Sequence, residues 1–184
     1  MPEQSINTVI IPAHEVLKRI GLDVGQRCAD LGVGRQANFT IAAAEIVGPR
    51  GLVYAVDVVK GILSTVEAKA KLHKVSNVVT VWSDLEVYGA AKAIGNGSLD
   101  VGMLITVLFQ SKQRKAMIEE AVRMVKTGGK LLVVDWKKGA TTFGPAVEVR
   151  PDPNEIKAIA AELGLSLVEE FEAGPFHFAL VFQK

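Results

Sequence analysis

Short apolar runs rich in β-branched residues alternate along the chain with longer segments whose apolar residues recur at helical spacing. The short runs predict strands. The first five are nearly continuous in apolar character, which is typical of strands whose two faces are both covered by helices. These five predicted strands are Arg27–Leu31, Leu52–Asp57, Val78–Trp82, Leu99–Ile105 and Lys130–Trp136. The alternation predicts an α/β fold with a parallel sheet.

The segments around these strands predict helices, most of them bounded by glycine or proline. One begins at Asp152-Pro153, where an aspartate cap precedes a proline in the first turn, and it ends at Gly164. A short helix is predicted between the third and fourth strands, over Val87–Ile94. The remaining predicted helices are Ala13–Ile20, Ala37–Val47, Lys60–His73 and Lys112–Val125.

Two further apolar runs close the chain, Leu165–Glu172 and Phe176–Gln183, and only a short turn at Gly174-Pro175 joins them. This turn is far too short for a parallel crossover, so the two strands are expected to form an antiparallel hairpin. We therefore expect a doubly wound α/β sheet of about seven strands, antiparallel only at its last strand, with helices on both faces.

Composition supports a folded core and argues against several functional classes. Hydrophobic residues make up 49% of the 184 residues, and charged residues make up 22%. The net charge of +1 gives no electrostatic footprint for nucleic acid. The single cysteine, Cys28, allows no intrachain disulfide and makes a cysteine-based zinc site unexpected. No apolar run approaches the ~20 residues that span a bilayer, and the first residues lack a secretory pattern, so we expect a cytoplasmic protein.

Glycines and polar residues gather at the carboxyl ends of the first four predicted strands, where doubly wound sheets bind ligands. Gly32-Val33-Gly34 by itself fits a plain turn equally well. A carboxylate at the end of the second strand, Asp57, can accept hydrogen bonds from both ribose hydroxyls, or it can cap the next helix. The full set in chain order is Asp30, Gly32, Gly34, Asp57, Asp84 and Thr106, and this order favours a nucleoside-containing ligand.

These motifs resemble those of the class I S-adenosylmethionine-dependent methyltransferases over nearly the whole chain. ADLGVG at Ala29–Gly34 looks like the family's glycine motif, and VYAVD ending at Asp57 looks like its ribose-binding motif. WSDLE at Trp82–Glu86 looks like the segment beside the adenine. The family's fourth- and fifth-strand segments resemble Ser98–Gln110 and Val125–Trp136. Within the class, the chain is similar to small methyltransferases of ubiquinone and menaquinone biosynthesis.

The resemblance implies a Rossmann-like fold, S-adenosylmethionine as cofactor and S-adenosylhomocysteine as product. It implies cofactor contacts from Asp30, Gly32, Gly34, Asn38, Asp57, Val58, Asp84, Leu85 and Thr106. A small-molecule acceptor is expected rather than nucleic acid, and its candidate contacts are His14, Gln110 and Trp136. No metal and no catalytic residue is assigned, because methyl transfer from a sulfonium mainly requires alignment and exclusion of water.

One position departs from the family pattern, since Gln36 stands where a third glycine is usual. A protein that binds the cofactor without transferring methyl groups is therefore an alternative. A nicotinamide-dependent oxidoreductase is a weaker alternative, because it predicts that third glycine and an apolar residue in place of Asp30.

We expect one domain over residues 1–184, in which residues 1–25 form a helical segment that covers the cofactor site. Self-association into a homo-oligomer is compatible with this domain organisation.

Overall fold

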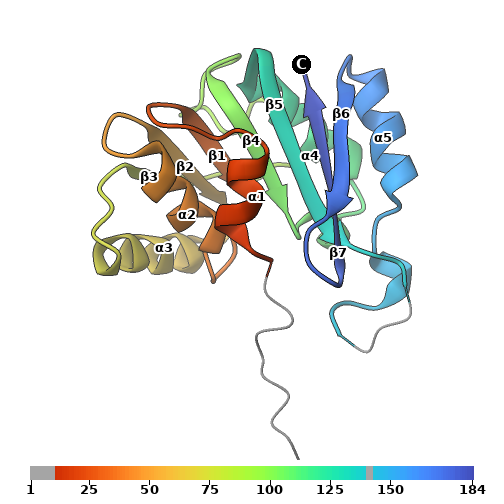
Figure 1. Ribbon diagram of the computed structural model, residues 1–184, viewed down its shortest axis with the longest axis horizontal. Helices are drawn as coiled ribbons and strands as arrows, with labels where there is room; N and C mark the ends of the chain where they lie inside the picture. The colour runs from red at the N-terminus through yellow and green to blue at the C-terminus, as the bar shows by residue number, and fades with distance from the viewer. Residues whose placement is uncertain (1–10, 140–142) are drawn as a thin grey trace, which may run out of the picture.

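One mixed sheet of seven strands organises the computed structural model, which describes residues 11–139 and 143–184 (Figure 1). The strand order is β3-β2-β1-β4-β5-β7-β6. The strands are β1 Arg27–Leu31, β2 Leu52–Asp57, β3 Val78–Trp82, β4 Leu99–Ile105, β5 Val125–Trp136, β6 Ser166–Glu172 and β7 His177–Gln183. The predicted doubly wound sheet is confirmed.

Strand β1 lies at the centre of the parallel part, with β2 on one side and β4 on the other. The strand order therefore reverses beside β1, and a crevice opens there at the carboxyl ends of β1 and β4. At the far side, β7 runs antiparallel to both β5 and β6, as predicted. The register pairs His177 with Trp136, so the beginning of β7 lies beside the end of β5.

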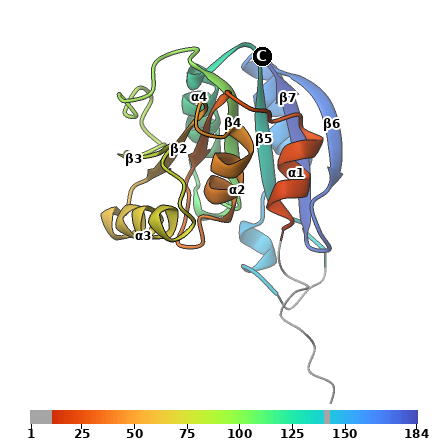
Figure 2. The ribbon, with the colours of Figure 1, turned by 60° about the vertical axis from the view of Figure 1, so that its left-hand side comes forward.

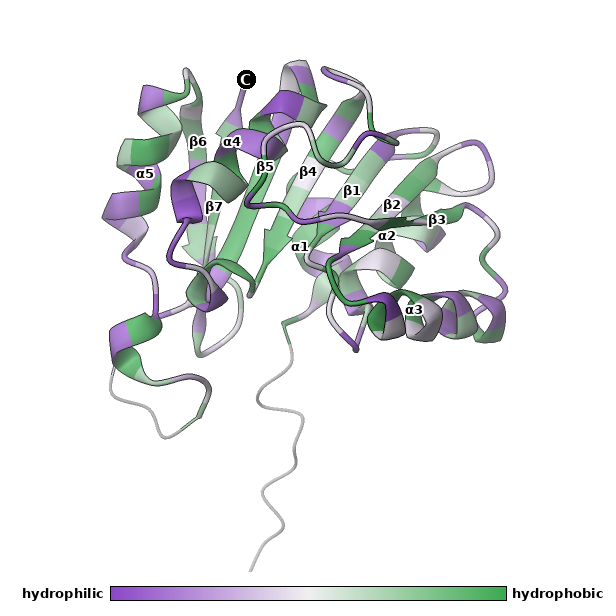
Figure 3. Ribbon diagram, turned by 180° about the vertical axis from the view of Figure 1, so that it is seen from behind, coloured by the Kyte–Doolittle hydropathy of each residue, from purple (hydrophilic) through white to green (hydrophobic). Residues whose placement is uncertain are grey.

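Helices cover both faces of the sheet (Figures 1, 2 and 3). One face carries α1 Ala13–Arg19, α2 Asn38–Val47 and α3 Lys60–Leu72, and α1 packs against α2. The other face carries α4 Arg114–Met124 and α5 Pro153–Glu162, seen in front of the sheet in Figure 3. Two short 3₁₀ turns, η2 Leu108–Gln110 and η3 Val147–Val149, complete the elements. No helix of the described residues is long and apolar enough to cross a bilayer.

Local sequence explains where these helices begin and how closely they pack. The Asp152 carboxylate accepts a hydrogen bond from the backbone N–H of Asn154 at 2.9 Å, and Pro153 occupies the first turn of α5, as predicted. In α2, Ala42, Ala43 and Ala44 are fully buried. Their small side chains allow this helix to lie close to the sheet beside β1.

The helix predicted over Val87–Ile94 is absent, and this prediction is wrong. The segment is a series of turns instead, in which Gly89 adopts a φ of +76°. The fully buried Glu120 carboxylate of α4 accepts hydrogen bonds from the backbone N–H groups of Gly89 (2.7 Å) and Ala91 (3.2 Å). These N–H groups are satisfied by a distant side chain, which removes the reason to form a local helix.

The predicted boundary between α4 and β5 also needs correction. The helix was expected over Lys112–Val125, but it ends at Met124. Val125 already pairs with Leu99 of β4, and the ladder then continues from Lys130 after an irregularity. Pairing with β4 therefore ends the helix one residue before its predicted end, and β5 begins at Val125 rather than at Lys130 as predicted.

The buried contact of Glu120 with this loop predicts a large effect of its removal. Glu120 also pairs with Arg123 at 2.7 Å, so the Glu120→Ala variant leaves two backbone N–H groups without their acceptor and removes the carboxylate partner of the guanidinium. We expect the free energy of unfolding, measured in urea, to fall by about 3–5 kcal/mol. The exposed neighbour Glu119 is the matched control, and Glu119→Ala is expected to change stability by less than about 0.5 kcal/mol. Similar values for the two variants would contradict this account of the loop.

Candidate functional site

The turn after β1 is built on two glycines with positive φ. Gly32 has a φ of +85°, and a Cβ atom added there would lie 2.4 Å from Cγ2 of Val107. No alanine fits without displacing the Val107 side chain, two residues after the end of β4. Gly34 has a φ of +63°, and an added Cβ would have no atom within 4 Å, so this glycine faces open space. The first glycine is required for packing, and the second leaves room for a ligand close to the backbone.

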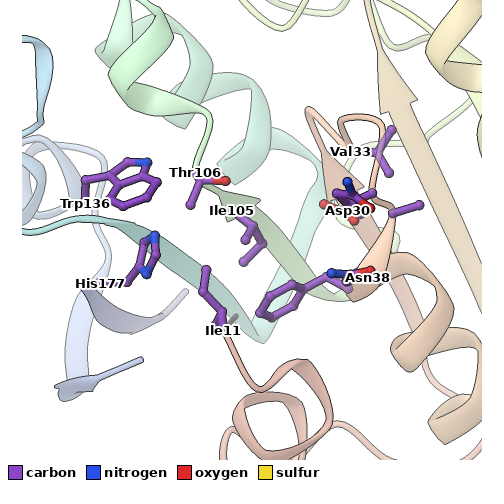
Figure 4. A pocket seen from close by; sticks show the side chains of 11 residues that line it. Ile11, Asp30, Val33, Asn38, Ile105, Thr106, Trp136 and His177 are labelled. Carbon is purple, nitrogen blue, oxygen red and sulfur yellow. The ribbon is translucent and has the colours of Figure 1, made fainter. Parts of the chain in front are cut away.

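Two cavities flank this turn. The first, called here the Asp57 cavity, has a volume of about 310 Å³. It is lined by Gly32, Gly34, Asp57, Val58, Val59, Ile62, Ser83, Asp84, Leu85, Glu86, Val107, Gln110, Ser111 and Met117. The second, called the Asp30 cavity, has about 450 Å³ and is shown in Figure 4. It is lined by Ile11, Asp30, Val33, Gln36, Ala37, Asn38, Phe39, Ile105, Thr106, Trp136 and His177.

The predicted site residues divide between these cavities. The Asp57 cavity brings together six of the nine expected cofactor contacts and one expected acceptor contact: Gly32, Gly34, Asp57, Val58, Asp84, Leu85 and Gln110. The Asp30 cavity brings together Asp30, Asn38, Thr106 and Trp136. His14 lines neither. Its Nε2 atom lies 2.8 Å from Oε2 of Glu45, in a hollow between α1, α2 and α3 that shares Ile11, Gln36 and Asn38 with the Asp30 cavity.

The segment expected to cover the site is described only in part, since residues 1–10 lie outside the described residues. Ile11, just before α1, lines the Asp30 cavity. Helix α1 itself packs through Val16, Leu17 and Ile20 into the core on one face of the sheet. Within the described residues, the contribution of this segment to the cavity is therefore limited to its first position.

Asp57 holds the glycine turn in place while it lines a cavity. Its Oδ2 atom accepts a hydrogen bond from the Gly34 N–H at 3.2 Å, and its Oδ1 atom accepts one from the Val59 N–H at 2.9 Å. The bond to Val59 lies just before α3, so the predicted ligand contact and the alternative of a helix cap both fit this carboxylate. Asp84 similarly accepts from the Glu86 N–H at 2.9 Å.

Asp30 is a buried carboxylate with one oxygen unsatisfied. Its Oδ2 atom accepts a hydrogen bond from the Thr40 hydroxyl at 2.7 Å, whereas Oδ1 has no hydrogen-bond partner among the described residues. Burial, assisted by the negative charge of Asp57, raises the pKa of Asp30 from 3.8 to about 6. A buried acceptor without a partner is costly, and such atoms commonly face a ligand.

The side chain at the third glycine position leaves the turn intact. The backbone oxygen of Gln36 accepts a hydrogen bond from the Lys69 ammonium at 2.8 Å, and the side chain is exposed at the rim of the Asp30 cavity. The next residue, Ala37, adopts a φ of +51° immediately before α2. A positive φ is therefore found at Ala37, one residue after Gln36, as well as at Gly32 and Gly34.

Three polar residues of the site were missed by sequence reasoning. Ser83 is buried at the Asp57 cavity, and its hydroxyl has no partner among the described residues. His177 is buried in the wall of the Asp30 cavity, at the beginning of β7. Asp135 is fully buried at the end of β5, and burial raises its pKa to about 6.

Asp135 stabilises the backbone next to the two cavities. Its carboxylate accepts hydrogen bonds from the backbone N–H groups of Trp136 (2.8 Å) and Phe109 (3.3 Å). These bonds tie the end of β5 to η2, and so they fix the segment that presents Thr106 and Val107 to the cavities. A lone acid inside the apolar run LLVVDW was the signal that could have revealed it.

A match to the protein family described as a methyltransferase domain covers residues 29–133, from β1 and its glycine turn to the middle of β5. The chain belongs to this methyltransferase family. The match includes Asp30, Asp57, Asp84 and Thr106, the residues that line the two cavities at successive strand ends.

Two relatives and two solved structures extend this finding. The demethylmenaquinone methyltransferase of Geobacillus sp. (strain WCH70) is 30% identical over 124 residues, covering 66% of this chain and 50% of the relative. That of Geobacillus stearothermophilus is 38% identical over 132 residues, covering 71% and 53%. The chain thus spans about half the length of these relatives.

Among solved structures, a SAM-dependent methyltransferase from Aquifex aeolicus superposes with a TM-score of 0.84 at 23% identity, over 94% of this chain and 89% of that one. The [4+2]-cyclase SpnF superposes with a TM-score of 0.76 at 14% identity, over 94% and 80%. These likenesses confirm the fold.

The burial of Asp30 predicts a pH-dependent stability difference. Its pKa is raised in the folded state, so its contribution favours folding below pH 3.8 and is lost as the pH rises through about 6. Asp30→Asn removes this titration. Between pH 4 and pH 7.5 we expect the stability of the variant, relative to the unchanged protein, to improve by up to about 3 kcal/mol in urea unfolding. Asp135 titrates in both proteins, so its contribution cancels in the difference between their free energies of unfolding. A pH-independent difference would contradict the buried, ionisable state of Asp30.

Proposed function

We propose that this protein is an S-adenosylmethionine-dependent methyltransferase that acts on a small-molecule acceptor. The observation that carries the proposal is the glycine turn with a cavity on each side, one bordered by Asp57 and the other by Asp30. Membership of the methyltransferase family and the relatives named above support it. The balanced charge of the chain gives no reason to assign a nucleic-acid acceptor.

The cofactor is proposed to lie across the turn, with its adenosine in the Asp57 cavity. Asp57 would accept hydrogen bonds from the ribose hydroxyls, and Leu85 would pack on the adenine ring beside Asp84. The two lone pairs that Asp57 already uses leave others on the same carboxylate for the ribose. The unpartnered Ser83 hydroxyl in this cavity supports the fit, because it needs a polar partner there.

The methionine end is proposed to cross the open space at Gly34 and to enter the Asp30 cavity. The free Oδ1 atom of Asp30 suits the positively charged amino group at that end, which would also stabilise the ionised carboxylate. Asp30 and Ser83 therefore each present a buried, unpartnered polar atom to a cavity, and the cofactor carries complementary groups for both. This match supports the proposed position of the cofactor.

When bound, S-adenosylmethionine supplies a methyl group activated by a positively charged sulfur. The protein residues then have three tasks, namely to hold the cofactor, to orient the acceptor and to exclude water. Asp30 and Asp57 serve the first task. The apolar side chains of Ile11, Phe39 and Ile105 serve the third, because they line the Asp30 cavity where the acceptor is proposed to enter.

Removal of Asp57 tests the proposed cofactor site. Loss of two charge-assisted hydrogen bonds predicts that Asp57→Ala weakens binding of S-adenosylhomocysteine by about a hundredfold in isothermal titration calorimetry. Asp100→Ala is the matched control, because the Asp100 carboxylate also accepts a hydrogen bond from a backbone N–H, that of Arg27, but lies at the opposite edge of the sheet. Unchanged affinity in Asp57→Ala would overturn the assignment.

Turnover is tested separately, with radiolabelled S-adenosylmethionine and a pool of small-molecule extracts. Transfer of label to an extractable product supports the methyltransferase proposal. Tight binding of S-adenosylhomocysteine without transfer to any acceptor pool would instead support the alternative of a cofactor-binding protein. Binding of NADH without binding of S-adenosylhomocysteine would contradict both.

A further inference from the structure

The acceptor side of the Asp30 cavity contains an aromatic pair from the two ends of an antiparallel strand pairing. Trp136 closes β5 and His177 opens β7, and the register places them opposite each other. Their ring centroids lie 4.2 Å apart with an interplanar angle of 48°. Figure 4 shows both side chains on one side of the cavity, with Asp30, Val33 and Asn38 on the other side.

His177 is buried, and its ring has no hydrogen-bond partner among the described residues. Only 2% of the His177 surface is exposed, whereas the neighbouring Trp136 is partly exposed. Its backbone takes part in the ladder with β5, which leaves the imidazole as the polar group presented to the cavity. A side chain that serves only the core at this position would be apolar or would bond to a neighbour.

The imidazole is held in its neutral form at pH 7. Burial, together with the positive charges of Lys137 and Arg150, lowers the pKa of His177 to about 4. Neutral imidazole carries one N–H donor and one nitrogen acceptor. It can therefore both donate to and accept from a hydroxyl group, but it offers no charge to an ionic ligand.

The wall behind this pair is firmly packed. The Arg150 side chain is buried and donates hydrogen bonds to the backbone oxygens of Lys137, Phe143 and Pro145 at 2.8–3.0 Å. A Cβ atom on Gly144 would lie 2.5 Å from the Trp136 ring. The segment therefore presses against Trp136 and limits its freedom, so the pair presents a fixed surface to a ligand.

We propose that His177 is an acceptor-binding residue, which selects an aromatic acceptor by a hydrogen bond to the acceptor's hydroxyl group. This inference rests on the proposed function, since the Asp30 cavity must be the acceptor side of the cofactor. The apolar lining of Ile11, Phe39 and Ile105 suits the ring of such an acceptor, and the nearby positive charges of Lys137 and Arg150 disfavour an amine. His177 orients the acceptor and is not assigned the proton transfer.

The test compares a hydroxyl-bearing probe with its matched hydrocarbon. Dissociation constants for 1-naphthol and naphthalene are measured by NMR titration of protein with labelled histidine imidazoles, with and without saturating S-adenosylhomocysteine. In the unchanged protein we expect 1-naphthol to bind about tenfold more tightly than naphthalene and to shift the His177 signal. His177→Phe should abolish this preference while naphthalene still binds. His177→Gln, which keeps a donor and an acceptor, should restore most of it.

His73→Phe is the control variant, because His73 directly follows α3 and lines neither the Asp30 cavity nor the Asp57 cavity, so we expect this variant to leave the preference unchanged. Equal preference in the unchanged protein and in His177→Phe would overturn the inference, as would failure of the unchanged protein to bind 1-naphthol. Failure to bind S-adenosylhomocysteine, with the hydroxyl preference retained, would overturn the proposed function alone.

Discussion

The close approach of Gly32 to Val107 is the constraint on which the rest of the site depends. The turn after β1 is held from one side by Val56, whose carbonyl oxygen accepts from the N–H groups of Gly32 and Val33, and by the Asp57 carboxylate. It is held from the other side by Val107, two residues after the end of β4, which leaves no room for a side chain at Gly32. The turn held in this way lies between the two cavities, and Gly34 within it faces open space. A cofactor that crosses the turn can therefore touch backbone, with its polar ends in different cavities.

The same edge of the sheet concentrates costly polar groups in an otherwise apolar core. Asp30 and Asp135 are both buried carboxylates whose pKa is raised to about 6, and Asp30 keeps one oxygen unpartnered. Groups of this kind reduce the stability of the folded chain at neutral pH. Their common position at strand ends is consistent with a functional rather than a structural origin. Asp135 differs from Asp30, because its oxygens are used to fix η2 and the end of β5.

The strands were predictable because they are apolar runs rich in β-branched residues, and six of the seven lie within one residue of the expected positions, while β5 begins five residues earlier than expected. Most of the residues that line the two cavities at strand ends were also expected there, since they follow parallel strand ends in chain order. Sequence could not show that Glu120 satisfies the N–H groups of Gly89 and Ala91, and a helix was wrongly expected there. Nor could it place His177, because only the register of an antiparallel strand brings the beginning of β7 to the end of β5.

The position of the cofactor decides the role of both cavities, and a crystal structure of the protein with S-adenosylhomocysteine tests it in one measurement. We expect electron density for the adenosine in the cavity bordered by Asp57 and Leu85, with the amino group of the homocysteine end at Oδ1 of Asp30. The His177 side of the Asp30 cavity should remain open for the acceptor. Density for the ligand outside these two cavities, or in the reverse orientation across Gly34, would contradict the account.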